Sequence, residues 1–336
     1  MLVKLPFPEV RFTYTTDWHF SVQPPGRRAD DYQAALFTKL EFQRELTEKL
    51  HGVGLCGADV FHHKKPTHPG NTIDLIIRLI RALRRFPTGC VYGSVGNHDL
   101  SWDRMASLPH QPLGILIAAH AYYNLNEAPV IFTNDDETVK VQVETFPYLP
   151  FANEQKTLET ILERGKIRPA GVDYRVGIVH AFGQPGNRGN LYDSDIIGYN
   201  ELKDAEYDFL LWGHDHSRKK TVTVGNVTHV HLGAMARAAY DIDEVDRPVS
   251  IGVLSFSKEG MKFLEKPIPV RPLDLVFSVA DKGMDKVIKS DAVKEFFSSM
   301  DEQVDGIESA DPRTVLRALC PDDSGLVSLV EELCGL

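Results

Sequence analysis

The chain has 336 residues, of which 43% are hydrophobic and 25% are charged. These values are typical of a soluble globular protein, and the length favours either one large domain with a small appendage or two domains. The 47 acidic residues outnumber the 37 basic residues, which gives a formal net charge of −10. The surface as a whole therefore does not attract polyanions, and any contact with nucleic acid has to be local.

The first 270 residues alternate short β-rich runs with helical stretches. Runs rich in β-branched or aromatic residues predict seven strands: Val10–Thr16, Val53–Cys56, Cys90–Ser94, Tyr174–Val179, Phe209–Trp212, Val227–Leu232 and Ile251–Phe256. Apolar residues at helical spacing predict three helices: Tyr32–Leu50, Thr72–Arg85 and Glu154–Gly165. The second helix carries a stripe that we expect to pack into the core: Ile73, Ile76, Ile77 and Ile80. This alternation predicts an α/β layered fold.

The pattern changes near Lys266. The stretch EKPIPVRPLDLVF holds three prolines, which exclude a helix and predict an extended connector. Beyond it, amphipathic patterns predict short helices without intervening strands: Asp291–Met300, Pro312–Leu319 and Ser324–Leu333. We therefore expect a main domain over residues 1–270, followed over residues 271–336 by a connector and a small helical segment.

The cysteines bear on the compartment. Cys56, Cys90, Cys320 and Cys334 show no C-x-x-C pairing and fall in apolar stretches, so we expect reduced thiols packed as small hydrophobic side chains. This favours a cytoplasmic location. The first residues lack the apolar region of a signal peptide, and no apolar run reaches the length that spans a bilayer. Neither secretion nor membrane insertion is expected.

Five apolar runs along the chain end in Asp, Asn or His. They are YTTDWHF, GLCGADVFHH, YGSVGNHDL, GIVHAF and LLWGHDH, and they contain Asp17, His19, Asp59, His62, Asn97, His98, Asp99, His180, His214 and His216. Each run alone is also compatible with a structural polar residue. Because loops at the carboxyl ends of parallel strands converge on one crevice, however, the five together predict a single metal site built from distant segments.

This series resembles the signature of the calcineurin-like metallophosphoesterases: D-x-H, G-D, G-N-H-[DE], a lone H and G-H-x-H. The resemblance spans Asp17 to His216 and implies a four-layer α/β/β/α sandwich with a two-metal centre. The roles that it implies, residue by residue, are one metal on Asp17, His19 and His216, a second metal on Asn97, His180 and His214, a bridge at Asp59, a catalytic imidazole at His98, and a supporting partner of that imidazole at Asp99.

One position departs from the family pattern. The family usually has glycine immediately before the bridging aspartate, whereas this chain reads Gly57, Ala58, Asp59. Because alanine is small, we expect a slight backbone adjustment there.

The chemistry of phosphodiester hydrolysis supports these assignments. It needs a hydroxide nucleophile at neutral pH and neutralisation of charge on the phosphoryl oxygens, which two cations roughly 3.5–4 Å apart provide. A carboxylate such as that of Asp59 is suited to bridging two cations. Ligands drawn from His, Asp and Asn without a thiolate suit Mn²⁺, Fe or Zn²⁺, with Mn²⁺ as the first choice. His98 adjoins Asn97, so we expect it beside the metals as a general acid.

A further resemblance concerns the substrate. The stretch DVFHHKKP resembles the G-D-[LV]-[FY]-[HD]-x-x-x-P segment of SbcD-like and MRE-eleven-type DNA repair nucleases, which implies His62 as a second catalytic histidine. The competing interpretation is that His62 is a supporting loop residue. Two basic clusters favour local DNA binding, although solvated charged turns are the alternative: His63, Lys64, Lys65 and His68 in this loop, and Arg218, Lys219 and Lys220 after the last motif.

The leading hypothesis is thus a Mn²⁺-dependent DNA exo- or endonuclease of the SbcD type. One alternative is a phosphodiesterase or phosphatase that acts on a small nucleotide or a phosphoprotein, and another is a binding subunit with a structural metal site. The connector and tail resemble a short version of the region by which SbcD-like nucleases dock on an SMC-like ATPase of the SbcC type. This implies DNA and such an ATPase as partners, with packing of the tail on the main domain as the alternative. A homodimer stays open.

Overall fold

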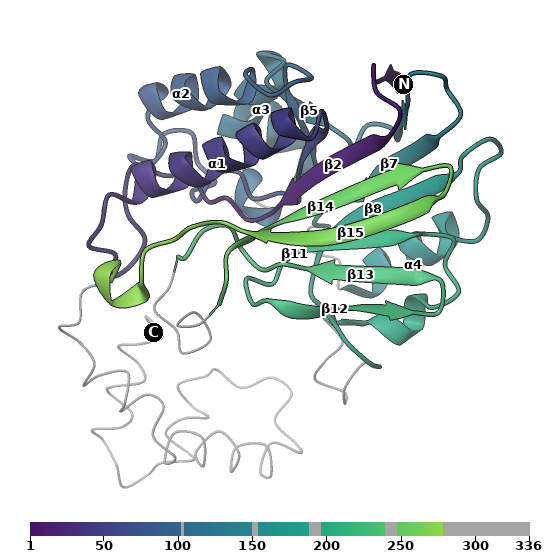
Figure 1. Cartoon of the computed structure of the whole chain (residues 1–336). Coiled ribbons are helices and arrows are strands. Elements are labelled where there is room, and N and C mark those ends of the chain that lie inside the picture. The colour runs from purple at the N-terminus through teal and green to yellow at the C-terminus, as the bar shows by residue number, and fades with distance from the viewer. Residues whose placement is uncertain (102–103, 150–153, 188–195, 239–246, 278–336) are drawn as a thin grey trace, which may run out of the picture. The chain divides into compact units, whose positions relative to one another are not determined.

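The structure is a computed structural model that describes residues 1–101, 104–149, 154–187, 196–238 and 247–277. Two β-sheets pack face to face, and helices cover the outer face of each sheet (Figure 1). This confirms the predicted α/β layered fold, in the four-layer α/β/β/α arrangement that the resemblance implies.

The first sheet has six strands in the order β15-β14-β2-β3-β4-β5. Strands β2 to β5 are parallel, whereas β14 is antiparallel to both β2 and β15. The strands are β2 (Val10–Thr15), β3 (Val53–Cys56), β4 (Val91–Gly93), β5 (Tyr122–Asn124), β14 (Ser250–Ser257) and β15 (Gly260–Pro267).

The second sheet has seven strands in the order β1-β6-β7-β8-β11-β13-β12, and β7, β8, β11 and β13 run parallel. The strands are β1 (Leu2–Lys4), β6 (Val130–Thr133), β7 (Lys140–Phe146), β8 (Tyr174–Ala181), β11 (Phe209–His214), β12 (Lys219–Val224) and β13 (Val227–His231). A separate parallel pair consists of β9 (Gly183–Gln184) and β10 (Ile197–Gly198).

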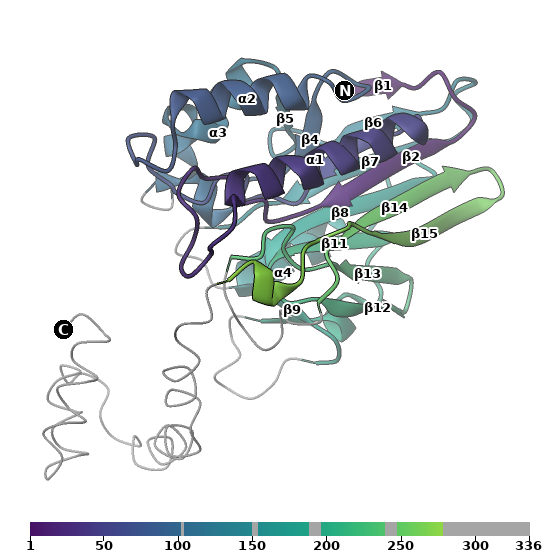
Figure 2. The ribbon, with the colours of Figure 1, turned by 60° about the vertical axis from the view of Figure 1, so that its left-hand side comes forward.

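Three α-helices pack against the six-stranded sheet: α1 (Tyr32–Lys49), α2 (Ile73–Leu83) and α3 (Pro112–Ala118). Figure 2 shows them gathered on one side of the molecule, and α4 (Glu154–Arg164) packs against the other sheet. The side chains of Asp31 and Thr72 cap α1 and α2, accepting hydrogen bonds from Ala34 N and Leu75 N, which satisfies backbone donors that a helix start leaves unpaired. Short 3₁₀ turns are η1 (Asn97–Asp99), η3 (Met105–His110), η5 (Tyr199–Leu202) and η6 (Leu273–Leu275).

The isoleucine stripe predicted for α2 is wrong in part. Ile73 is 78% exposed and Ile77 is 40% exposed. The face that α2 buries instead consists of Leu75, Ile76, Leu79 and Leu83. The leucines continue the spacing of three and four residues that one helical face requires, and the isoleucines alone do not define that face.

Apolar side chains from both sheets form the core between them. Phe12 of β2 contacts Phe132 of β6 edge to face, with ring centroids 5.2 Å apart, and Val53, Val143 and Leu211 are buried in the same cluster. Each such side chain stabilises the folded state by about 1.5–3 kcal/mol when it is withdrawn from water. The docking of the two sheets thus fixes the strand ends that carry the polar motifs.

The described chain continues past the predicted boundary near residue 271. Val276 and Phe277 are buried together with Leu273, and the amide of Ala29 donates to the carbonyl of Val276 over 2.8 Å. Residues Met1–Ser278 form one contact unit. The three predicted tail helices, Cys320 and Cys334 lie outside the described residues, so the division at residue 270 stays a prediction. Cys56 and Cys90 are free thiols, as predicted.

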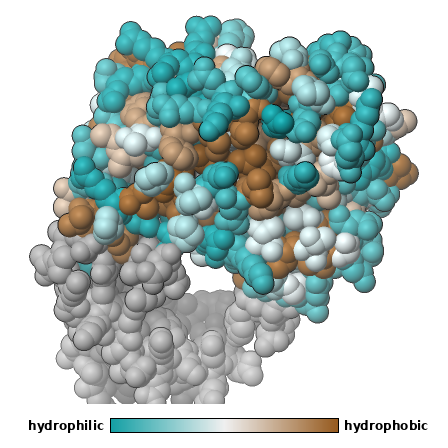
Figure 3. Space-filling view, in the orientation of Figure 1, coloured by the Kyte–Doolittle hydropathy of each residue, from teal (hydrophilic) through white to brown (hydrophobic). Residues whose placement is uncertain are grey.

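Figure 3 shows hydrophilic side chains over much of one face, with an apolar area near its middle. Among the described residues, no helix has both the length and the apolar character needed to cross a membrane.

Candidate metal centre

The five motif-bearing strand ends meet at one place between the two sheets. Strands β2, β3 and β4 are neighbours in the first sheet, and β8 and β11 are neighbours in the second. Asp17, Asp59 and Asn97 follow the first three strands, whereas His180 is the penultimate residue of β8 and His214 is the last residue of β11. The structure therefore brings together the ligand candidates that were identified from the sequence.

The backbone at these strand ends is unusual. Five of the eight non-glycine residues with positive φ in the described chain lie here: Asp17 at 51°, His19 at 49°, Ala58 at 137°, Asp59 at 48° and His214 at 80°. Side-chain-bearing residues seldom adopt positive φ, and such backbone conformations persist at functional sites where the surrounding fold enforces them.

A first group of ligand atoms lies around His19 and His216. Their Nε2 atoms are 2.9 Å apart. The Nε2 of His216 is 3.9 Å from Asp17 Oδ1, and that of His19 is 3.9 Å from Asp59 Oδ2. Asp17 is held in place because its carboxylate accepts hydrogen bonds from the His214 amide and from the Thr16 hydroxyl. One ligand atom from each of Asp17, His19, Asp59 and His216 lies within 4.8 Å of the others.

A second group lies around Asn97. Its Oδ1 is 3.2 Å from His180 Nε2 and 3.1 Å from His214 Nδ1. The Nε2 of His180 is also 3.4 Å from Asp59 Oδ2. Both groups thus share the same oxygen of Asp59, which is the position of a bridging carboxylate.

Close packing fixes Asp59 in this shared position. Its Oδ1 accepts a hydrogen bond of 2.9 Å from the amide of His98, which leaves Oδ2 between the two groups. A Cβ atom added at Gly96 would lie 2.0 Å from Asp59 Oδ1 and 2.8 Å from His180 Nε2. The glycine before Asn97 is therefore required by the closeness of the ligand side chains.

The donor atoms fit two divalent cations. Ligand atoms bound about 2.1 Å from one cation lie about 3–4 Å from each other, which matches the separations of 2.9–3.9 Å in both groups. Imidazole nitrogen, carboxylate oxygen and amide oxygen are ligands for Mn²⁺, Fe and Zn²⁺, and the described part of the site contains no thiolate.

The electrostatics also suit cations. Burial lowers the pKa of His214 to about 3, with the neighbouring His180 adding to the effect. Burial likewise lowers the pKa of His19 well below its usual value, although Asp59 opposes this shift. For Asp59 itself, burial raises the pKa, but His180 and His19 outweigh burial and the net shift is downward. Burial also lowers the pKa of His180, but Asp59 and Asp17 outweigh burial and raise it to about 9. The rings of His19 and His214 are thus neutral, as metal ligands must be, whereas His180 carries a proton beside Asp59 that a bound cation would replace.

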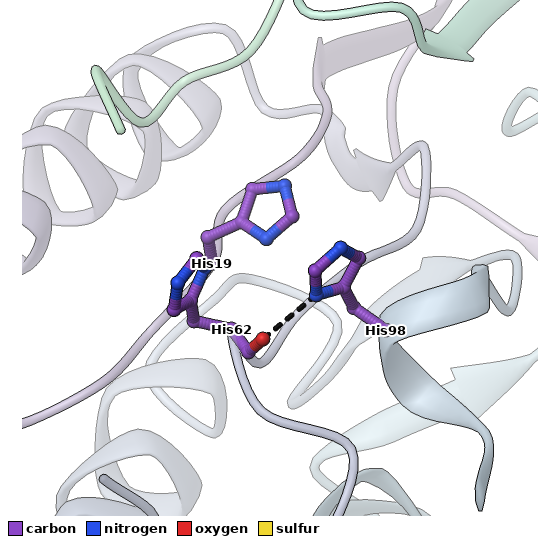
Figure 4. A group of neighbouring side chains, drawn as sticks. All are labelled: His19, His62 and His98. Carbon is purple, nitrogen blue, oxygen red and sulfur yellow. Dashed lines mark hydrogen bonds between the residues drawn. The ribbon is translucent and has the colours of Figure 1, made fainter. Parts of the chain in front are cut away.

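His62 and His98 lie next to the first group. Figure 4 shows the rings of His19, His62 and His98 close together, and one ring nitrogen from each lies within 4.8 Å of the other two. The Nδ1 of His98 is 2.7 Å from the carbonyl oxygen of His62. Since a carbonyl can only accept, Nδ1 carries the proton and Nε2 is left to exchange protons with a substrate. Burial, His63 and His98 lower the pKa of His62 to about 4, so its ring is neutral near pH 7.

Asp99 makes different contacts from those expected of a partner for His98. Its buried carboxylate accepts hydrogen bonds from the amides of Val60 and Gly96, each 3.0 Å long. It thus ties the chain after β3 to the turn after β4. The His62 carbonyl contacts the His98 ring in its place, a role that side-chain motifs could not indicate because it belongs to the backbone.

The backbone at Ala58, which departs from the family pattern, has an unusual conformation. Its φ of 137° lies in a region that side-chain-bearing residues rarely adopt, because a Cβ atom there crowds the adjacent backbone. Its carbonyl nevertheless accepts a hydrogen bond of 3.2 Å from the Asp17 amide. The alanine therefore adopts a conformation that favours glycine and carries backbone strain.

The two basic clusters differ in their surroundings. Arg218 pairs with Glu265 over 2.8 Å, and Lys219 forms an ion pair with Asp215. The loop after His62 is instead held by the side-chain amide of Asn71, which donates hydrogen bonds to the carbonyls of His63 and Lys65. Two cations of the second cluster are thus already engaged with carboxylates.

The sequence matches no protein-family model and no curated protein. Among solved structures, it is similar to a 5'-nucleotidase precursor from Thermus thermophilus, at 13% identity and a TM-score of 0.40, covering 87% of this chain and 60% of that one. It is also similar to the purple acid phosphatase PPD1 from yellow lupin, at 11% identity and a TM-score of 0.47, covering 78% and 52%. A third similarity is to the protein TT1561, also of Thermus thermophilus, at 8% identity and a TM-score of 0.40, covering 76% and 97%.

The chain thus spans about three fifths of the nucleotidase precursor and about half of the lupin phosphatase.

Proposed function

We propose that the chain is a two-cation phosphodiester hydrolase of the calcineurin-like metallophosphoesterase type. The observation that supports this most is the pair of ligand groups that share Asp59 Oδ2, with the His98 ring beside them. A purely structural cation site needs no imidazole held next to it, whereas hydrolysis needs a proton donor for the leaving oxygen. We assign Mn²⁺ as the first choice of metal.

The chain's own residues have distinct tasks in this proposal. Asp17, His19 and His216 hold one cation, Asn97, His180 and His214 hold the other, and Asp59 bridges them. When bound, two such cations neutralise charge on the phosphoryl oxygens and lower the pKa of water. His98, with Nδ1–H fixed on the His62 carbonyl, holds a proton at Nε2 in its imidazolium form and donates it to the leaving oxygen.

DNA is the substrate that we propose first. The loop from His62 to Gly70 begins beside His98 and carries the partly exposed Lys64 and the exposed Lys65. Asn71 holds the backbone of this loop through the carbonyls of His63 and Lys65. A basic loop whose backbone is fixed next to the His98 ring supports local binding of DNA phosphates, although the chain as a whole is acidic. Action in DNA repair with an SMC-like ATPase partner belongs to the same proposal.

A specific observation favours a small nucleotide as the second candidate. Glu265 and Asp215 pair with Arg218 and Lys219, which were expected to bind DNA at the other rim. Because of these pairs, fewer basic side chains can bind the phosphates of a long DNA than the sequence suggests. A small nucleotide needs fewer contacts outside the metal centre.

A comparison of substrates tests both candidates. Purified chain with Mn²⁺ would be given labelled double-stranded DNA, single-stranded DNA, a cyclic nucleotide and p-nitrophenyl phosphate. Cleavage of DNA supports the first candidate, and turnover of the small esters alone supports the second. Failure to hydrolyse any of them, with both cations bound, would contradict the enzyme proposal.

A further inference from the structure

Phe182 has an unusual place for an exposed aromatic residue. It follows β8 directly and lies two positions after His180. Its side chain is 40% exposed, whereas the other Phe, Tyr and Trp side chains in the described ranges are buried or partly buried. A lone exposed apolar residue elsewhere on the surface would need no explanation. This one lies at the metal centre.

The ring of Phe182 contacts a ligand of the second group. Its centroid is 4.3 Å from that of His214, and the two rings meet edge to face at 65°. The partly buried ring of Tyr148 is 5.8 Å from the same imidazole. His214 Nδ1 faces Asn97 Oδ1, so the exposed phenyl ring packs on an imidazole that would hold the second cation.

The backbone of Phe182 is fixed on both sides of the ring. Its amide donates to Glu154 Oε1 over 3.1 Å, and its carbonyl accepts from the Ile197 amide over 2.8 Å. The next residue, Gly183, lies so close to Trp212 that an added Cβ atom would be 2.5 Å from the indole ring. An exposed ring on a fixed backbone loses little conformational freedom when a ligand covers it.

We infer that Phe182 is a stacking platform for the nucleobase attached, through its sugar, to the phosphoester at the metal centre. This inference rests on the proposed function and names its substrate class: esters of nucleotides rather than of alkyl alcohols or phosphoserine. Bases stack on exposed aromatic rings with little sequence preference, because every base has a π-face. A phenyl ring beside a phosphate-binding centre favours a nucleotide over a sugar phosphate, because only the nucleotide carries a base that can stack on it.

Equilibrium binding tests the inference without any need for turnover. Adenosine monophosphate and ribose phosphate, which differ by the base, would be titrated into the Mn²⁺-loaded chain and its variants. We expect the wild type to prefer adenosine monophosphate, and Phe182→Leu to reduce that preference about tenfold, the size of one stacking contact. Phe182→Tyr keeps an aromatic ring and restores the preference.

A matched control is Phe7→Leu. Phe7 also packs on a histidine, with its ring 4.2 Å from that of His51, but it is not among the candidate ligands or their ring neighbours. We expect this variant to keep the wild-type preference. The Mn²⁺ content of each variant, measured in parallel, shows whether a loss of affinity comes from damage to His214.

The possible results separate this inference from the proposed function. A wild type without preference for the base, or a Phe182→Leu variant that keeps the preference, would overturn the inference even if esters are hydrolysed. A Phe182→Leu variant that loses Mn²⁺ and binds both ligands equally poorly would also overturn it, since Phe182 would then support the metal site. A preference that depends on Phe182 in a chain that hydrolyses no ester would support the inference and contradict the proposed function.

Discussion

His98 Nδ1 lies 2.7 Å from the carbonyl oxygen of His62, so the backbone of the loop after β3 sets the tautomer and orientation of the imidazole after β4. The ring is not among the atoms of the two groups that share Asp59. A substitution at His98 can therefore remove the proposed proton donor without removing a ligand of either group.

We expect His98→Ala to lower hydrolysis by about 10²–10⁴-fold while both cations stay bound, because a positioned general acid contributes a factor of this size. Steady-state kinetics and metal analysis of the same preparation check this. His110→Ala, at an exposed position of η3, is the control and should leave both quantities unchanged. Loss of one cation from the His98 variant would instead make His98 a ligand.

Asp59→Asn should weaken both cations together, since one oxygen of this carboxylate faces both groups. His216→Ala should weaken one cation far more than the other, because His216 belongs to the first group alone. Calorimetric Mn²⁺ titration distinguishes the two patterns. The exposed Asp204, changed to Asn, is the control for a lost surface charge. If the Asp59→Asn variant bound one Mn²⁺ with the wild-type affinity and only the other more weakly, Asp59 would not bridge the two cations.

Ala58→Gly should stabilise the fold by about 1 kcal/mol. A strained φ costs about 1–3 kcal/mol, whereas the added freedom of glycine in the unfolded chain costs about 0.5–1 kcal/mol. Urea unfolding in the presence of a chelator measures this difference. Ala34→Gly, at an exposed position in α1, should have the opposite sign. A destabilised Ala58→Gly variant would show that the backbone at Ala58 is not strained.

Lys39 should make the stability depend on pH. It is buried on α1 and donates to the Met235 carbonyl over 2.7 Å. Burial, with Arg28, Arg237 and Arg247, lowers its pKa from 10.5 to about 7, although Asp30 opposes the shift. Between pH 7 and 10 the unfolded chain thus binds more protons at this lysine than the folded chain, and its contribution to the unfolding free energy rises with pH, by at most about 1.4 kcal/mol per pH unit.

The matched variant for this effect is Lys39→Met, which keeps the length of the side chain without a titrating group. We expect the unfolding free energy of the wild type, followed by urea denaturation from pH 7 to 10, to rise relative to that of the variant. Parallel pH profiles of the two proteins would show that Lys39 does not change its protonation on unfolding.

Two truncations test how far the main body extends. A chain that ends after Ser278 should fold and hydrolyse small esters, because it keeps all the ligands and the buried Leu273, Val276 and Phe277. A chain that ends after Val270 loses these side chains and the bond between Ala29 and Val276, and should be less stable by on the order of 4 kcal/mol. Equal melting temperatures for the two would place the boundary at residue 270.

The sequence predicts the strands that carry the site because each is a run rich in β-branched or aromatic residues. The polar motif at the end of each run predicts the site itself. Strand β7 is not among the predicted strands, and its sequence does not show why Gln142 and Glu144 are buried. The reason lies in another strand: Glu144 pairs with the buried Arg175 of β8 over 2.6 Å. The pairing of Arg218 with Glu265 is equally invisible, because a charged run says nothing about a partner 47 positions away. A single phenylalanine such as Phe182 looks in sequence like any residue of the core.

Each ligand group takes residues from both sheets: His216 joins Asp17 and His19 in the first group, and Asn97 joins His180 and His214 in the second. Neither sheet alone can assemble either group, so the cation sites arise when the sheets dock. A bound cation then acts as a cross-link between the layers and raises the unfolding free energy as its concentration rises above the dissociation constant. The rate at which a refolding chain binds the cation would thus measure how fast the two sheets dock. We expect this step to be slow, because the residues that it brings into contact lie far apart in the sequence.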